Sequence, residues 1–394
     1  MLERLFYGNE NLRRTFIQGC LLRVVFLIIV VILGDTDIEP YIMSDDRMYE
    51  ELAVKYLDSA SGLYDIMAAR ALNLDGFLQV FWPYFICVSA KLMGTAYAGR
   101  ILNVVFSSLC ILLVYRLIQI ISDKEETAMR GAKLMAFFPY MVIICVFPLK
   151  DIFLSTCVLY MFLKMLEWHE GISVPTREII FAITLAVCAY LTRGGVVEFL
   201  GISLGIFVLH HFLVNRRYVE MAIFAILIIV VFSYLWNDII GAFEMKLEAY
   251  KTESFVSDGT MRYIQIYSLS DFWRLPFAYF FAIVQPMTMN LFNLEWTDWS
   301  PFLRLLNLSA YPVAFGNLCY IVMTKKNLVF WLATFVMFAS VISLSLGIYR
   351  HYMFLYPTLL INYALIQELE NKFVNSLILY GSIAMIALVV ILSL

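Results

Sequence analysis

Long apolar runs recur along the whole 394-residue chain, and they constrain its fold more than any other feature. Many are about 20 residues long, which is the length a helix needs to cross the hydrocarbon core of a bilayer. Hydrophobic residues make up 62% of the chain and charged residues 15%, with a mean hydropathy of +0.82. A soluble domain would carry far more surface charge. The sequence therefore predicts an all-α, polytopic membrane protein.

Net charge and cysteine content limit the kinds of partner that this protein can bind. The formal net charge is only −3, and no Lys/Arg-rich run is present to follow a phosphate backbone, which excludes nucleic acid. The seven cysteines lie mostly in apolar stretches, without a CxxC pair or a metal-ligand spacing. We therefore expect the lipid bilayer to be the main surrounding partner and the cysteines to be packing residues.

Lys and Arg flank the apolar runs unequally, which predicts the orientation because cytoplasmic loops are enriched in both. Arg13 and Arg14 put the N-terminus in the cytoplasm, and the acidic stretch 35–76 then lies outside. The predicted spans are near 15–34, 100–121, 132–148, 152–168, 177–192, 196–214, 219–235, 304–323, 327–346, 352–367 and 373–393. These eleven spans fit a multi-pass protein of a bacterial inner or plasma membrane, with the C-terminus outside.

Two apolar segments contain proline and are not counted as spans. Residues 77–93 hold Pro83 and Lys91, and residues 275–291 hold two prolines. We expect each to dip into the external surface of the membrane.

The chain then forms a single transmembrane domain, 1–394. Its parts are a helical module (1–235) with an external loop (35–99), a second external loop with a dipping segment (236–302), and C-terminal helices (303–394).

An amphipathic helix is predicted over residues 44–60 in the first external loop. Ser44 is a plausible N-cap, and Asp45 and Asp46 occupy the first turn, where the helix dipole favours anions. One face carries the apolar stripe Met48, Tyr49, Leu52, Ala53, Tyr56 and Leu57. Asp45 precedes Met48 and Tyr49 by three and four residues, so we expect it to point toward the bundle. The alternative is that both aspartates only cap a surface helix.

Further charged residues gather at predicted external ends of spans. Lys150 and Asp151 follow one span, Arg193 ends another, and Arg350 and His351 begin a third. Charge placed centrally in a membrane costs about 2.5 to 3.5 kcal/mol, so such groups often face a polar cavity or one another. Any single basic residue among them is also explained by snorkelling to the interface. Together, they predict a polar site on the external face.

Several motifs resemble the GT-C membrane glycosyltransferases, a group that includes protein O-mannosyltransferases and lipid A aminoarabinose transferases. The acidic pair in SDDRMYEELA is similar to the motif of their first external loop. FWPYFICVSAKLMGTAYAGRILNVVFSSLCILLVYRL is similar to their dipping segment and Arg-led second span, and FFPYMVIICVFPLKDIFL to a second external loop with an acid. The likeness covers roughly the first 200 residues. Asp46 stands where these families often have Glu, and no large soluble C-terminal domain follows.

The resemblance implies an inverting displacement on a sugar carried by a polyprenyl phosphate or diphosphate. One carboxylate removes the proton from the acceptor hydroxyl, and Asp45 is the expected base. The implied catalytic carboxylates are Asp45, Asp46 and Asp151, and the implied phosphate-binding residues are Arg193, Arg350, Lys150 and His351. Tyr49 and Trp82 are candidate sugar or acceptor contacts, although interfacial aromatics commonly serve as membrane anchors. Asp45 and Asp151 leave open a divalent cation, Mg²⁺ or Mn²⁺.

Two other functions compete with this prediction. A polysaccharide polymerase or ligase would also use acidic loops and arginines, with lipid-linked oligosaccharides as substrates, and the polar stretch 237–274 is long enough to shape its acceptor groove. A transporter would place ionisable groups deep within spans and discontinuous helices in both halves. Arg23, Lys164 and Glu198 lie nearer the ends than the centres of the predicted spans, which argues against a transporter. The sugar and the glycan, lipid or protein acceptor are not determined by the sequence.

Overall fold

The computed structural model describes residues 9–34, 40–41, 44–58, 80–230, 233, 308–323, 328–343 and 353–393. Every regular element in these ranges is helical, which confirms the all-α prediction for this part of the chain. The elements are α2 (Glu10–Leu33), α3 (Ser44–Asp58), α5 (Phe81–Met93), α6 (Ala98–Ser122), α7 (Glu125–Phe137), α8 (Pro139–Ile144), α9 (Lys150–His169), α10 (Thr176–Thr192), α11 (Gly194–Val214), an apolar helix Tyr218–Val230, α16 (Ala310–Met323), α17 (Leu328–Ser343), the 3-10 turn η2 (Met353–Leu355), α19 (Tyr356–Gln367) and α20 (Lys372–Ser393).

The apolar runs of the sequence coincide with these helices. Within the described ranges, three helices are long and apolar enough to cross a membrane: α2, α6 and the Val196–Val214 part of α11. Shorter apolar helices include Tyr218–Val230, Leu328–Phe338, Met353–Gln367 and Lys372–Leu388, which fall within four other predicted spans or overlap them. The structure therefore supports an association with membrane, while the count of eleven crossings stays a prediction.

One predicted span is not a single helix. The run expected over 132–148 is divided into α7 and α8 at Phe138, whose backbone is extended with φ −61° and ψ 117°. Pro139, the first residue of α8, has no N–H to donate and disfavours helical geometry in the residue before it. The prediction of one continuous helix here was wrong, and the proline explains the interruption.

The first dipping segment forms the short helix α5. Its 13 residues extend over about 20 Å, less than the roughly 30 Å of a hydrocarbon core. Gly94 ends it in a left-handed conformation with φ 68°, and the chain turns directly into α6. The ring of Trp82, the second residue of α5, lies near Phe106 of α6 and Phe153 of α9. These contacts agree with a segment that turns back at one end of the bundle.

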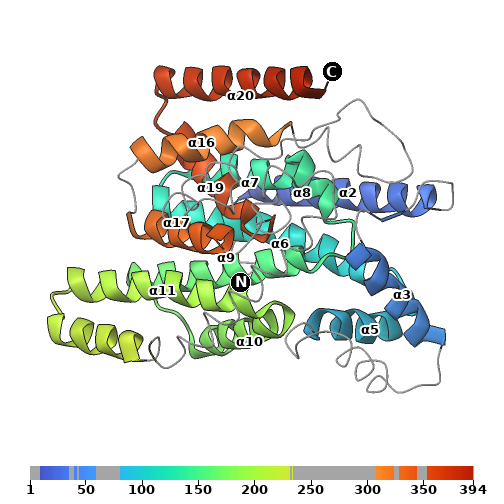
Figure 1. The fold of residues 1–394 in the computed structure, drawn as a ribbon, viewed down its shortest axis with the longest axis horizontal. Helices are drawn as coiled ribbons and strands as arrows, with labels where there is room; N and C mark the ends of the chain where they lie inside the picture. Colours follow the sequence, from blue (N-terminus) through green and yellow to red (C-terminus); the bar gives the residue numbers. More distant parts are fainter. Residues whose placement is uncertain are drawn as a thin grey trace.

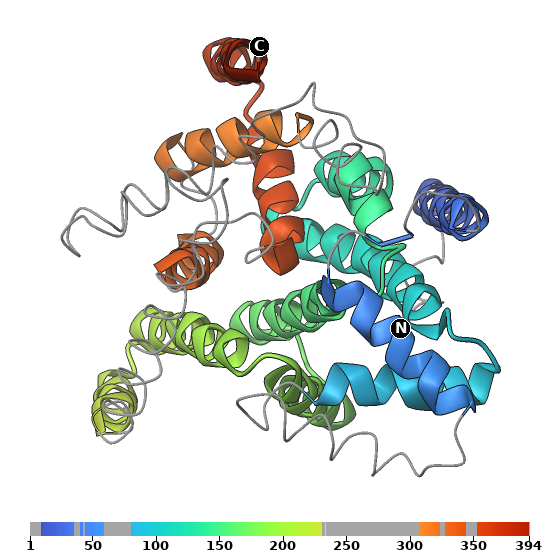
Figure 2. The same ribbon diagram turned by 45° about the vertical axis from the view of Figure 1, so that its right-hand side comes forward.

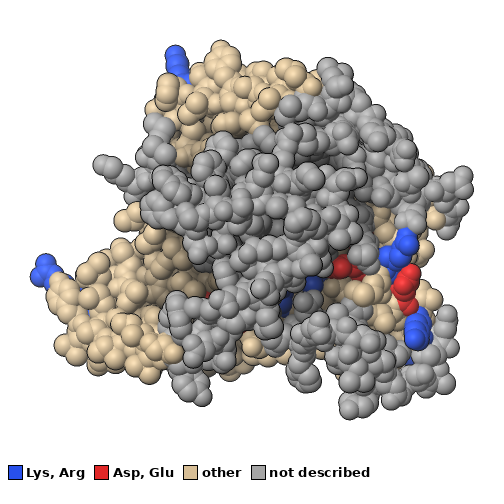
Figure 3. All heavy atoms as spheres, viewed as in Figure 1, with Lys and Arg blue, Asp and Glu red and all other residues tan. Residues whose placement is uncertain are grey.

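The long helices lie side by side, with α20 on the outside against α16 (Figures 1 and 2). We call the end of the bundle formed by α3 and the first residues of α6 and α9 the α3 end, and the end where α6 and α9 finish the opposite end. In the view of Figure 3 most of the described surface is neither acidic nor basic, and charged side chains are few. Exposed apolar residues cover α2, α10 and α20 in particular, as expected for surfaces that face lipid.

The centre of the core is α9. Sixteen of its twenty residues are buried, and it packs against α6, α10 and α11. None of the seven cysteines forms a disulfide and five of them are buried, which agrees with their predicted role in packing. Nothing in the structure tests the proposed division into parts, and the loop 236–302 lies outside the described residues.

Candidate functional site

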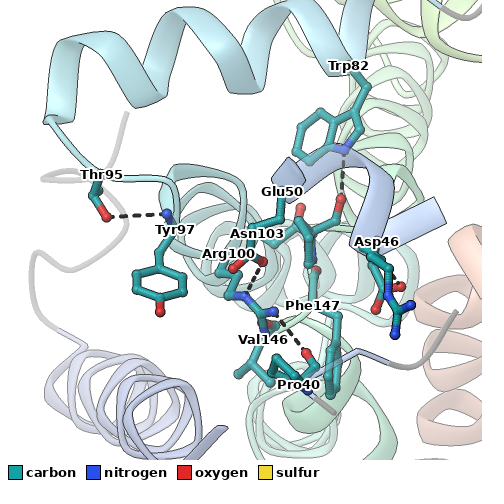
Figure 4. Close-up of polar contacts among 12 residues, drawn as sticks. Pro40, Asp46, Glu50, Trp82, Thr95, Tyr97, Arg100, Asn103, Val146 and Phe147 are labelled. Atoms are coloured by element: carbon teal, nitrogen blue, oxygen red, sulfur yellow. Dashed lines mark hydrogen bonds and ion pairs between the residues drawn. The ribbon is translucent and has the colours of Figure 1, made fainter. Parts of the chain in front are cut away.

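Arg100 connects three separate segments at the α3 end. It is the third residue of α6 and is fully buried. Its Nε donates to the Glu50 carboxylate of α3 at 2.7 Å, and its two terminal nitrogens donate to the carbonyls of Pro40 at 2.8 Å and Val146 at 3.3 Å (Figure 4). The guanidinium therefore holds α3, the chain before it and the segment before α9 in one arrangement.

Burial controls the protonation of the groups around Arg100. The pKa of Glu50 is raised above its usual value because burial disfavours the carboxylate, and Arg100 opposes this shift without cancelling it. Burial and the nearby Glu50 carboxylate together raise the pKa of Tyr41 to about 12. Tyr41 also lies beneath both Arg47 and Arg100, 5.4 and 5.5 Å from its ring centroid. The α3 end thus combines a dry environment with fixed positive charge.

The segment between α8 and α9 is held through its backbone carbonyls. The Asn103 amide donates to the carbonyls of Phe147 at 2.6 Å and Leu149 at 2.8 Å, and the Trp82 indole N–H donates to that of Pro148 at 2.9 Å (Figure 4). Asn103 is fully buried, and its side-chain oxygen has no hydrogen-bond partner among the described residues. These bonds fix the backbone that leads directly into Asp151.

Asp151 and Arg193 form the second charged pair of the α3 end. Arg193 Nη1 lies 3.4 Å from Asp151 Oδ1, and the aspartate side chain is only 3% exposed while that of Arg193 is 27% exposed. Arg193 is the extended residue between α10 and α11, and its guanidinium also lies over the Phe354 ring at 5.7 Å. A partly exposed Arg anchored by a buried carboxylate is suited to bind an anion such as phosphate.

The acidic pair on α3 lies as predicted at the start of the helix, but the buried member differs. Asp46 is fully buried and accepts a hydrogen bond from the Arg47 backbone N–H at 3.0 Å, whereas Asp45 is only partly buried. The more deeply buried carboxylate is therefore Asp46, one position after the residue that the sequence favoured. The buried face of α3 contains Asp46, Tyr49, Glu50 and Ala53. Tyr49 and Ala53 belong to the predicted apolar stripe, whereas the carboxylates Asp46 and Glu50 do not. The buried face is therefore rotated slightly around the helix from that stripe.

Both predicted aromatic contacts are buried. Trp82 has no exposed surface and stacks on Phe153 with a 5.6 Å centroid distance, while Tyr49 is 3% exposed. In this conformation they pack the α3 end and present no face to a ligand. Their predicted role in contacting a sugar stays a prediction.

The other predicted site residues are placed only in part. Lys150 begins α9, beside Asp151, and is partly buried. Arg350 and His351 lie outside the described residues, as does the stretch 237–274. Within the described ranges, no group of three or more potential metal ligands forms, and the metal suggestion for Asp45 and Asp151 stays untested.

Glu50, Arg100 and Asn103 were not predicted as site residues. A signal for Glu50 exists in its spacing, four residues after Asp46, which places both on one helix face. Arg100 and Asn103 are three residues apart at the start of a long apolar run, which also places them on one helix face. Their partners are 44 to 60 residues away in sequence, so the pairing itself required the structure.

Comparison with known proteins assigns no family to this chain. No protein-family model, no curated protein and no solved structure matches the chain.

Proposed function

We propose that this protein is a glycosyltransferase of the GT-C type, with about eleven spans, that transfers a sugar from a polyprenyl phosphate or diphosphate on the external face of the membrane. The observation that supports it most is the Asp151–Arg193 pair at the same end of the bundle as the acidic helix α3. Carboxylates of α3 and α9 and the guanidinium of Arg193, between α10 and α11, thereby lie at one end of an apolar bundle.

The chemistry assigned to these groups is an inverting displacement. The acceptor hydroxyl oxygen forms a bond to the anomeric carbon, the bond from that carbon to the phosphate oxygen breaks, and the phosphate takes the electron pair. A carboxylate accepts the hydroxyl proton, which requires hydrogen-bond reach to the acceptor. Arg193 neutralises the charge that develops on the leaving phosphate.

Asp46 is the base in this proposal. Sequence reasoning selected the carboxylate that faces the bundle, and in the structure this is Asp46 and not Asp45. Asp46 is chosen because its side chain lies on the face of α3 that packs against the bundle. Asp45, which is partly exposed, is the second candidate.

The test uses purified protein in detergent with polyprenyl-phosphate sugars as donors. Release of polyprenyl phosphate and donor binding are measured for the wild type, Asp46→Asn, Asp45→Asn and the control Glu51→Gln. Glu51 is exposed on the same helix, so its substitution makes the same charge change away from the bundle. We expect Asp46→Asn to retain donor binding and to lose turnover by about 10² to 10⁴, and Glu51→Gln to match the wild type.

Other outcomes distinguish the alternatives. Full turnover in both Asn variants would exclude the α3 aspartates as the base. Binding of diphosphate-linked oligosaccharides without release from any monosaccharide donor would favour the polymerase or ligase. If the wild-type protein neither binds nor turns over any of these donors, the proposal is rejected.

A further inference from the structure

Arg23 is a fully buried cation near the middle of α2. The helix covers Glu10–Leu33, so Arg23 is the fourteenth of its 24 residues and has no exposed surface. The sequence-based placement of Arg23 nearer an end was wrong, because it lies close to the centre of both the predicted span 15–34 and the observed helix. Arg stays charged in proteins, so this position requires compensation inside the bundle.

All the hydrogen-bond partners of Arg23 are neutral. Nε donates to the Ser107 hydroxyl at 2.9 Å, and Nη1 donates to the carbonyl of Gly19, one turn earlier in α2, at 3.0 Å. Nη1 also donates to the Ala136 carbonyl at 2.9 Å, and Nη2 to the Met135 carbonyl at 2.8 Å. No carboxylate approaches this guanidinium in the described part of the chain.

The Met135 and Ala136 carbonyls belong to the last turn of α7, just before the interruption. The last four carbonyls of a helix have no partner within it, and here Phe138 N–H takes only that of Leu134, at 2.8 Å. Pro139 has no N–H, so the usual i+4 partner of Met135 is missing. These carbonyls are also the negative end of the helix dipole, where a cation is favoured. Arg23 replaces the missing donors and neutralises this end.

Close packing brings Arg23 to the interruption. A Cβ atom added to Gly19 would lie 2.7 Å from Ile111 Cδ1 and 3.1 Å from Ala136 Cβ. A glycine at this position therefore allows α2 to approach the end of α7 to within reach of one Arg side chain.

The interruption leads directly to the candidate site. The helix α8 has only six residues, and Cys145 follows it, fully buried. The next four carbonyls, of residues 146–149, are those bound by Arg100, Asn103 and Trp82, and Asp151 comes two residues later. Any shift at the end of α7 would displace this segment.

We propose that Arg23 is a positioning residue: it acts as a tethered cation that caps the interrupted helix α7 from within the bundle, and so fixes α8, the segment 145–149 and the start of α9. Broken helices in membrane proteins often leave their free carbonyls to a bound ion or to water. In this protein an Arg from the neighbouring helix fills that role. The inference does not depend on glycosyl transfer.

The first measurement is the labelling rate of Cys145 by a membrane-permeant maleimide, with the other six cysteines replaced by Ala. Arg23 also lies beside the Cys145 thiol, and loss of its charge alone would slow labelling. We expect local opening to outweigh this and Arg23→Met to raise the rate by about tenfold or more, since opening exposes a buried thiol. Arg23→Lys keeps the charge but loses the planar set of guanidinium donors, so we expect its labelling rate to lie between those of the parent and Arg23→Met. In a matched protein with only Cys157, which is fully buried in α9, the rate should not change. Equal rates for parent and Arg23→Met at Cys145 would overturn the proposal.

The second measurement couples Arg23 to the proline. If Arg23 compensates for the donor missing at Pro139, then Arg23→Met should lower the unfolding midpoint by about half as much in a Pro139→Ala background as in the parent. Equal shifts in the two backgrounds would show that Arg23 acts independently of the interruption. If Arg23→Met alone gives no folded protein, Arg23→Met/Pro139→Ala must restore it, and failure of both would also overturn the proposal.

Discussion

Ion pairs occur at both ends of the helix bundle, and the two ends differ in how many partners each charge has. At the opposite end the charges share partners: Glu167 binds both Arg116 and Lys164, and Lys164 also binds Glu178. Glu368 accepts from both Lys124 and the Ser122 hydroxyl. At the α3 end each buried carboxylate of the two pairs has a single cation among the described residues, Arg100 for Glu50 and Arg193 for Asp151.

This difference separates structural charge from functional charge. Loss of one partner at the opposite end leaves the remaining groups satisfied, as expected of a network that only supports helix ends. Loss of one partner at the α3 end leaves a buried charge alone, which is costly and is seldom maintained for stability alone. We therefore expect substitutions at the two ends to differ in their effects by several-fold.

The largest effect is expected from Arg100→Met. It leaves the Glu50 carboxylate and two carbonyls buried without their donor, and such breaks cost about 3 to 5 kcal/mol. The matched control is Arg116→Met at the opposite end, where Glu167 keeps Lys164 and the loss should be below about 1 kcal/mol. Chemical unfolding of both variants in the same detergent measures the two losses. Similar losses would remove the contrast between the ends.

Arg193→Met should have the next largest effect. The Asp151 side chain, 3% exposed, would lose the one cation that pairs with it in the described part of the chain, at a cost of about 1 to 3 kcal/mol. The double variant Arg193→Met/Asp151→Asn should recover part of this loss because the uncompensated charge is gone. Unfolding midpoints of the two single variants and the double variant complete the cycle, and strict additivity would contradict the pairing.

Glu50→Gln should change how stability depends on pH. The folded-state pKa of Glu50 is raised above 4.5, so the folded protein holds this proton more tightly than the unfolded chain does. Stability from this group is then greatest at low pH and falls as the pH rises from about 4.5 through the higher folded-state value. In Glu50→Gln this fall should be absent. Unfolding midpoints between pH 4 and 8 measure the difference, and parallel curves for both proteins would refute the raised pKa.

The smallest effect is expected from Lys124→Gln. The Lys124 side chain is 60% exposed, and Glu368 keeps the Ser122 hydroxyl at 2.6 Å. The change in unfolding free energy should stay within about 0.5 kcal/mol. A larger loss would mean that the opposite end also depends on single partners.

The helices could be predicted from sequence because apolar runs and breaking residues are local signals. The run near 100–121 is α6 and that near 152–168 is α9, each within a few residues. The interruption at Pro139 was missed although the proline was visible, because the apolar run continues across it. Hydropathy reports burial, and it does not report where a backbone hydrogen bond is lost.

The site was predicted in outline and not in its contacts. Asp151 and Arg193 were both selected from their positions at span ends, and the structure brings them to 3.4 Å. Asp45 was favoured over Asp46 because periodicity fixes a helix face only to within about one residue. The Glu50–Arg100 pair joins residues 50 apart, and no local pattern specifies such a partner.

The burial of α9 has a consequence for how the protein enters the membrane. Its buried residues include Asp151, Lys164 and Glu167, so it has no side that suits a purely lipid environment. Released alone into the bilayer, this helix would expose those ionisable groups at a cost of a few kcal/mol. We therefore expect α9 to remain at the insertion machinery until α10 and α11 have been made. A chain truncated just after α9 should then be inserted inefficiently and degraded, whereas one truncated after α11 should persist.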